Sequence, residues 1–153
     1  MIKQSISFLV AVTIATVLLI TQTTVTNIAW LFSMDMPVDA SVVISMIVGD
    51  LIGMNVNGAF PVGGLVLVGM LIAFIVTRIA LIWVNIDKRH LYALAGGMAM
   101  FAIVGLMPLA FYNLELIAGA RTFTGKGYLI FTGVIAGYYF GTRQTEETTN
   151  EKA

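Results

Sequence analysis

The chain has 153 residues, of which 59% are hydrophobic and only 10% are charged. Eight basic residues balance eight acidic ones, so no excess of positive charge points to nucleic acid as a partner. The absence of cysteine excludes disulfides, thiolate chemistry and iron–sulfur clusters. A single histidine cannot build a multi-histidine site within one chain, and we expect neither a metal, nor a cofactor, nor an enzymatic activity.

Four long apolar stretches cover most of the sequence, at about residues 6–32, 64–84, 91–112 and 127–142. A helix needs ~20 residues to cross ~30 Å of hydrocarbon, and each stretch is near that length. The sequence therefore predicts an all-α integral membrane protein, with four transmembrane helices bundled in a single domain over residues 1–143. The polar residues 144–153 predict a disordered cytoplasmic tail.

The N-terminal stretch shares some features with a secretory signal peptide, because Lys3 precedes an apolar run. No small-x-small cleavage pattern follows that run, and apolar residues resume before Phe32. We therefore favour an uncleaved first helix over a signal peptide that is removed.

The connection between the first two stretches holds a further apolar segment, residues 39–54, with Asp39 as a good N-cap at its start. A helix over residues 40–54 would be only about 23 Å long at ~1.5 Å per residue. That length is short for a full crossing. We expect one short re-entrant or interfacial helix here, between spans 1 and 2, and the sequence does not separate these two placements.

The distribution of positive charge predicts the orientation, because Lys and Arg are enriched in cytoplasmic loops. In a four-span topology one side carries both termini together with Lys3, Lys88, Arg89, Arg143 and Lys152. The other side carries only two basic residues, in the loop between spans 3 and 4. We therefore expect both termini in the cytoplasm. The compact chain lacks eukaryotic targeting features, which favours a bacterial inner membrane.

The last apolar stretch contains three glycines spaced four residues apart, Gly133, Gly137 and Gly141. Residues at this spacing share one helix face. A face of glycines lets another helix backbone approach closely, which matters in lipid because little hydrophobic force acts between helices there. The stripe is either an oligomer seam or a contact within the bundle, and we favour the contact within the bundle.

A second stripe of small residues lies in the short helix, formed by Ser41, Ser45, Gly49 and Gly53. These residues are again four apart and so share one face. The stripe predicts that the short helix lies tightly against a transmembrane span.

Asp50 is an ionisable residue in an apolar helix, which is costly in lipid and by default suggests a function. With Asn55 and Asn57 it would line a polar outer vestibule, to which the threonines within residues 21–26 would contribute. The simpler interpretation, which we favour, places Asp50 at the hydrated headgroup level, the asparagines in an exterior turn and the threonines in helix–helix hydrogen bonds.

Arg78 lies in the second span, shortly before Trp83. Its long side chain can extend to the cytoplasmic headgroups, and we favour this interpretation. A buried ion pair or a contact with a lipid phosphate inside the bundle is the alternative.

These observations favour a small multi-pass membrane protein that acts by helix association, as a homo-oligomer or an accessory subunit of a membrane complex. Its partners would be the lipid bilayer and either itself or another membrane protein. The alternative is a small oligomeric transporter or channel with its vestibule around Asp50. An intramembrane enzyme is the least favoured class, because the sequence contains no paired carboxylates and no nucleophile–base motif.

Overall fold

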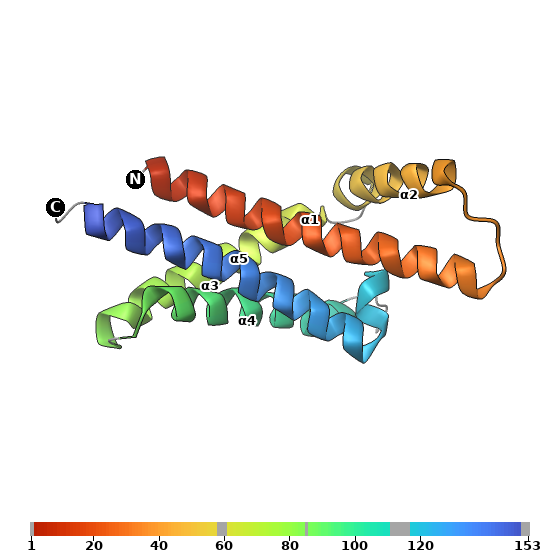
Figure 1. The fold of residues 1–153 in the computed structure, drawn as a ribbon. Coiled ribbons are helices and arrows are strands. Elements are labelled where there is room, and N and C mark those ends of the chain that lie inside the picture. The colour runs from red at the N-terminus through yellow and green to blue at the C-terminus, as the bar shows by residue number, and fades with distance from the viewer. Residues whose placement is uncertain (1, 58–60, 85, 111–116, 151–153) are drawn as a thin grey trace.

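The computed structural model describes residues 2–57, 61–84, 86–110 and 117–150, and this part of the chain is helical with no strand (Figure 1). The predicted all-helical class is thus confirmed. The elements are α1 (Ile2–Ser33), α2 (Ala40–Ile52), the π-helix η1 (Gly53–Asn57), α3 (Val62–Trp83), α4 (Lys88–Ala110), the 3₁₀-helix η2 (Ala118–Arg121) and α5 (Phe123–Asn150).

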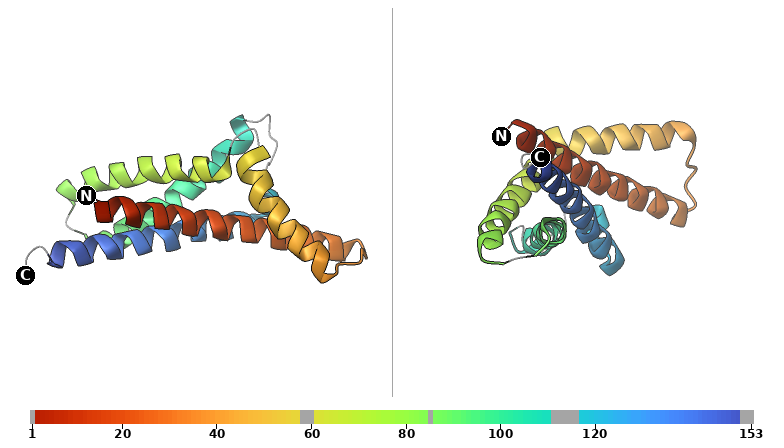
Figure 2. Two further views of the ribbon diagram at one scale, coloured as in Figure 1. Left: turned by 90° about the horizontal axis from the view of Figure 1, so that it is seen from above. Right: turned by 60° about the vertical axis from the view of Figure 1, so that its left-hand side comes forward.

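The four long helices form one elongated bundle, in which α1 and α4 run in one direction and α3 and α5 run in the other (Figures 1 and 2). The start of α1, the end of α3 and the end of α5 lie at the same end of the bundle. The short helix α2 lies beside the last part of α1, beyond the start of α3. The bundle therefore has two chemically different ends, one of which carries α2.

Among the described residues, three helical segments are long and apolar enough to cross a membrane: Ile2–Ser33, Val62–Trp83 and Lys88–Leu109. These segments correspond to the first three predicted spans. The fourth predicted span lies in α5, which is not among them because glycine, threonine and tyrosine recur along it. The structure is thus compatible with a membrane protein, and it does not confirm the fourth span.

α5 is longer than the predicted fourth span and remains helical to Asn150. The sequence predicts disorder from residue 144, whereas residues 144–150 are helical. Arg143 and Glu146 form an ion pair one turn apart, with 3.1 Å between nitrogen and oxygen, which supports the helix beyond the apolar stretch.

A turn that begins at Met34 links α1 to α2. Asp35 has a φ of 53°, a left-handed conformation that Asp tolerates better than most residues. The carboxylate of Asp39 accepts a hydrogen bond from the Val42 amide at 2.9 Å, which makes Asp39 the N-cap of α2. The predicted cap is confirmed, and it fixes where the short helix begins.

The core runs between the four long helices, and its fully buried side chains come from α1, α3, α4 and α5 and include Leu19, Val66, Met70, Met100 and Leu129. The outward-facing residues of these helices are also largely apolar. An apolar outer surface is expected where lipid is the solvent.

Candidate functional site

α4 and α5 share the most extensive helix contact in the structure, and the glycines of α5 form its centre. A Cβ atom added to Gly137 would lie 2.8 Å from the carbonyl carbon of Tyr92 and 3.1 Å from the Cα of Ala93. A Cβ at Gly141 would lie 2.7 Å from the Cα of Arg89. These neighbours are backbone atoms, which cannot rotate away. The stripe therefore packs within the chain, along what we call the α4–α5 seam.

The seam contains a glycine whose role the sequence analysis missed. A Cβ added to Gly96 of α4 would lie 3.0 Å from the carbonyl carbon of Gly133 and 3.2 Å from the Cα of Gly137. Close approach thus needs a glycine on both helices. Gly96 has no glycine four residues away, so only its position opposite the α5 stripe could have indicated this contact.

The second stripe of small residues does not pack as predicted. Ser41, Ser45 and Gly49 are exposed, and no heavy atom lies within 4 Å of a Cβ built on Gly49 or Gly53. The expectation that this stripe lies against a span is therefore wrong within the described chain. The reason is that α2 is held to α1 through a different face, where Asp50 is half-buried.

We call one exposed side of α2 its open face. Small residues run along it, and branched aliphatic side chains flank them. None of the residues of α2 is buried. The open face consists of Ser41, Ile44, Ser45, Val48, Gly49 and Ile52, all of which are exposed.

Asp50 and Asn55, two of the three predicted vestibule residues, form hydrogen bonds between elements. The Thr24 hydroxyl of α1 donates to the Asp50 carboxylate at 2.7 Å. The Asn55 side chain accepts from the Gly63 amide at 3.1 Å and donates to the Leu51 carbonyl at 2.9 Å, so it caps the start of α3. The side chain of Asn57, the third predicted residue, lies outside the described side chains.

Three buried oxygens on α1 have no hydrogen-bond partner among the described residues: the hydroxyls of Thr16 and Thr23 and the side-chain carbonyl of Gln22. Thr23 is only 4% exposed. Buried polar atoms are nearly always satisfied by protein, water or an ion, so these oxygens mark a hydrophilic stretch inside an apolar bundle.

Arg78 is exposed and forms no hydrogen bond or ion pair with any residue of the described ranges. The buried ion pair considered from the sequence is thus absent from this part of the chain. Arg78 instead lines a cavity of about 360 Å³ near the end of α3.

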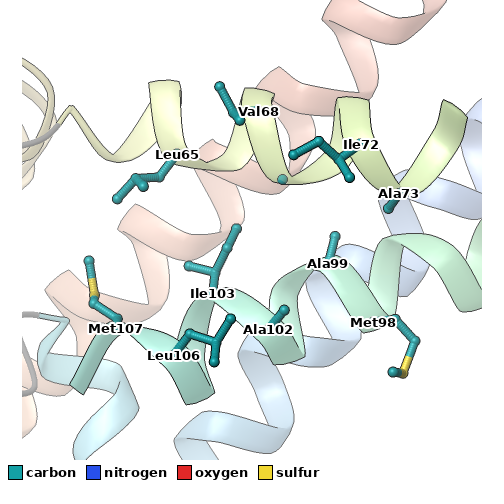
Figure 3. Close-up of a pocket in the computed structure, with 11 residues that line it drawn as sticks. Leu65, Val68, Ile72, Ala73, Met98, Ala99, Ala102, Ile103, Leu106 and Met107 are labelled. Carbon is teal, nitrogen blue, oxygen red and sulfur yellow. The ribbon is translucent and has the colours of Figure 1, made fainter. Parts of the chain in front are cut away.

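A second, larger cavity of about 480 Å³ separates α3 from α4 (Figure 3). Leu65 and Ile72 of α3 lie across it from Ile103, Leu106 and Met107 of α4. The described residues that line it are all apolar, so this cavity offers space for hydrocarbon.

Within the described ranges, no three histidine, aspartate or glutamate side chains come together in a way that could hold a metal ion. A comparison of the chain with protein-family models finds no match, and neither do comparisons with curated proteins and with solved structures. The fold and its surfaces therefore define the class only broadly: an all-helical chain with three helices that are able to cross a membrane.

Proposed function

We propose that this chain is a four-span membrane protein that works by helix association. The observation that carries the proposal is the open face of α2, an apolar surface with small residues at its centre and no covering element in the described chain. Small residues at four-residue spacing are the feature that allows helices to associate in lipid. Gly133, Gly137 and Gly141 already use this feature within the chain, whereas α2 leaves it unused.

The occupant we propose for the open face is a second copy of this chain. A two-fold axis would bring the stripe of one copy onto the same stripe of the other, so both sides would have small residues where the backbones come closest. Because Ser45 and Gly49 lie in the middle of the stripe, we expect the two helices to cross near them.

We further propose that α5 is the fourth crossing and that both termini are cytoplasmic, in a bacterial inner membrane. α5 runs antiparallel to α1 beside it, as a fourth span would (Figure 1). Lys3, Arg89 and Arg143 would then share the cytoplasmic side. The interfacial placement of α2 suits its position beyond the start of α3. A reporter enzyme fused after Asn57 should read out as exterior, and a cytoplasmic readout would contradict this topology.

The experiment for self-association is purification of the tagged chain from its own membrane in a mild detergent, with the mass determined by light scattering. We expect a dimer for the wild type and a monomer for Gly49→Leu, because the leucine fills the stripe. Gly105→Leu is the matched control, since nothing lies within 4 Å of a Cβ at Gly105 either. A monomeric wild type contradicts the proposal. A stoichiometric second protein would instead make the chain an accessory subunit.

A small oligomeric transporter or channel is the second candidate. It is favoured by the carboxylate of Asp50 and by the buried oxygens of Thr16, Gln22 and Thr23, which have no hydrogen-bond partner in the described part of the chain. Such groups suit water or a cation passing along α1. The test is cation flux into proteoliposomes for the wild type and Asp50→Asn. Loss of flux in the variant supports transport, and unchanged flux removes Asp50 from any mechanism.

A further inference from the structure

The cavity beside Arg78 lies at the end of the bundle away from α2 and has a volume of about 360 Å³. All four long helices contribute to its lining. Its polar lining residues include Arg78 of α3 and Gln4 of α1, and its apolar ones include Leu71 and Ile75 of α3. Small-molecule sites range from ~300 to ~1,000 Å³, so this volume is sufficient for part of an amphipathic ligand.

The floor of the cavity is made of aromatic rings that hold one another in place. Phe74 stacks on Phe140 with 4.7 Å between ring centroids, and Tyr92 meets Phe140 edge-on at 5.0 Å. Phe8 packs edge-on against Phe74 at 6.0 Å. Because Phe74, Tyr92 and Phe140 are each at most 7% exposed, the floor is fixed by the core. The cavity is therefore present before any ligand arrives.

Among the described residues that line the cavity, Arg78 is the only charged one. It lies five residues before the end of α3 at Trp83, or ~7.5 Å along the helix axis. If α3 crosses the membrane as proposed and ends at the interface, this depth corresponds to the boundary between headgroups and acyl chains. No described carboxylate neutralises Arg78, so its positive charge is available to a ligand.

We propose that this cavity binds one anionic phospholipid, with the phosphate on Arg78 and an acyl chain over the aromatic floor. An arginine that only extends to the headgroups needs no cavity behind it. Here an exposed cation lines a preformed and mainly apolar space. A positive charge beside an apolar space matches the phosphate and the acyl chain of a lipid. A guanidinium also suits a phosphate, because it presents several N–H donors in one plane.

The test is native mass spectrometry of the full chain in detergent, with equimolar phosphatidylglycerol and phosphatidylcholine added. A single cation near an anionic group supplies a preference of about fivefold for the anionic lipid. We expect this preference in the wild type and in Lys3→Gln, which removes a cation at the same end that does not line the cavity. Arg78→Gln should abolish it, and Arg78→Lys should restore most of it.

A second variant separates the binding of a lipid from charge attraction at the surface. Leu71→Trp fills part of the cavity and should lower retention of both lipids. The proposal is overturned if the wild type and Arg78→Gln show the same preference for phosphatidylglycerol. It is also overturned if Lys3→Gln loses as much of this preference as Arg78→Gln does. Because the cavity lies far from the open face of α2, Gly49→Leu should leave lipid selectivity intact. A failure of the association proposal would therefore not alter the lipid result, and the two proposals can be tested independently.

Discussion

Replacing Gly137 by alanine tests the α4–α5 seam at one of its tightest points. The added Cβ would lie 2.8 Å from the carbonyl carbon of Tyr92, whereas ordinary contact begins near 3.4 Å. The carbonyl oxygen of Tyr92 lies closer still, so the helices must separate by more than 0.6 Å, the difference between these two distances. A gap of ~0.5–1 Å forfeits a quarter to a half of each dispersion contact along the seam. Overpacking of this kind costs ~1–3 kcal/mol.

Gly127→Ala is the matched control, because it places the same methyl group on the same helix in open space. Replacing a glycine in a helix by alanine stabilises that helix by ~0.5–1 kcal/mol through backbone entropy. Both variants share this gain, so the difference between their unfolding free energies isolates the steric cost. We expect Gly137→Ala to be less stable than Gly127→Ala by ~1–3 kcal/mol.

The assay is reversible unfolding in mixed micelles, in which sodium dodecyl sulfate is titrated into a mild detergent and the helical circular dichroism is followed. The free energies of the two variants and the wild type are compared at the same micelle composition. If Gly137→Ala proves as stable as Gly127→Ala, the helices are not in contact at Gly137 and the seam is refuted.

Two further predictions concern the first turns of α2 and α3. Asn55→Ala removes the acceptor for the Gly63 amide and should destabilise the start of α3 by ~1 kcal/mol, seen as faster amide exchange there, whereas Asn55→Asp should preserve protection. The Val42 amide holds the pKa of Asp39 below its ordinary value of 3.8, so the cap is fully present above pH 3.8 and is lost as the pH falls through the lowered pKa. The protection of the amides at the start of α2, measured relative to their intrinsic exchange rate at each pH, should therefore fall in this acidic range in the wild type. In Asp39→Asn this protection should not change with pH.

The sequence predicts the positions of the helices well, because length and hydropathy are local properties. The apolar runs place α1, α3 and α4 within a few residues of their observed ends, and Asp39 marks the start of α2. α5 is the exception, since polar residues beyond position 143 continue its helix. Polarity indicates solvent exposure and does not by itself end a helix.

The faces that helices use are harder to predict, because periodicity identifies a face without identifying its neighbour. The stripes at Gly137 and Gly49 look alike in sequence, yet one is covered by α4 and the other is open. The difference depends on long-range contacts: Gly96 lies opposite the first stripe, and Asp50 turns its own side of α2 towards Thr24. The cavity beside Arg78 likewise needs four helices to form it.

The most direct test of the account is disulfide cross-linking of single-cysteine variants in native membranes, since the chain has no cysteine of its own. Ser45→Cys lies on the open face of α2, and Ile47→Cys lies on another side of the same helix and is also exposed. Two cysteines link only when their Cα atoms approach within ~7 Å. Self-association through the open face predicts a strong covalent dimer for Ser45→Cys and little for Ile47→Cys. Equal yields from the two variants, or no dimer from either, would contradict it.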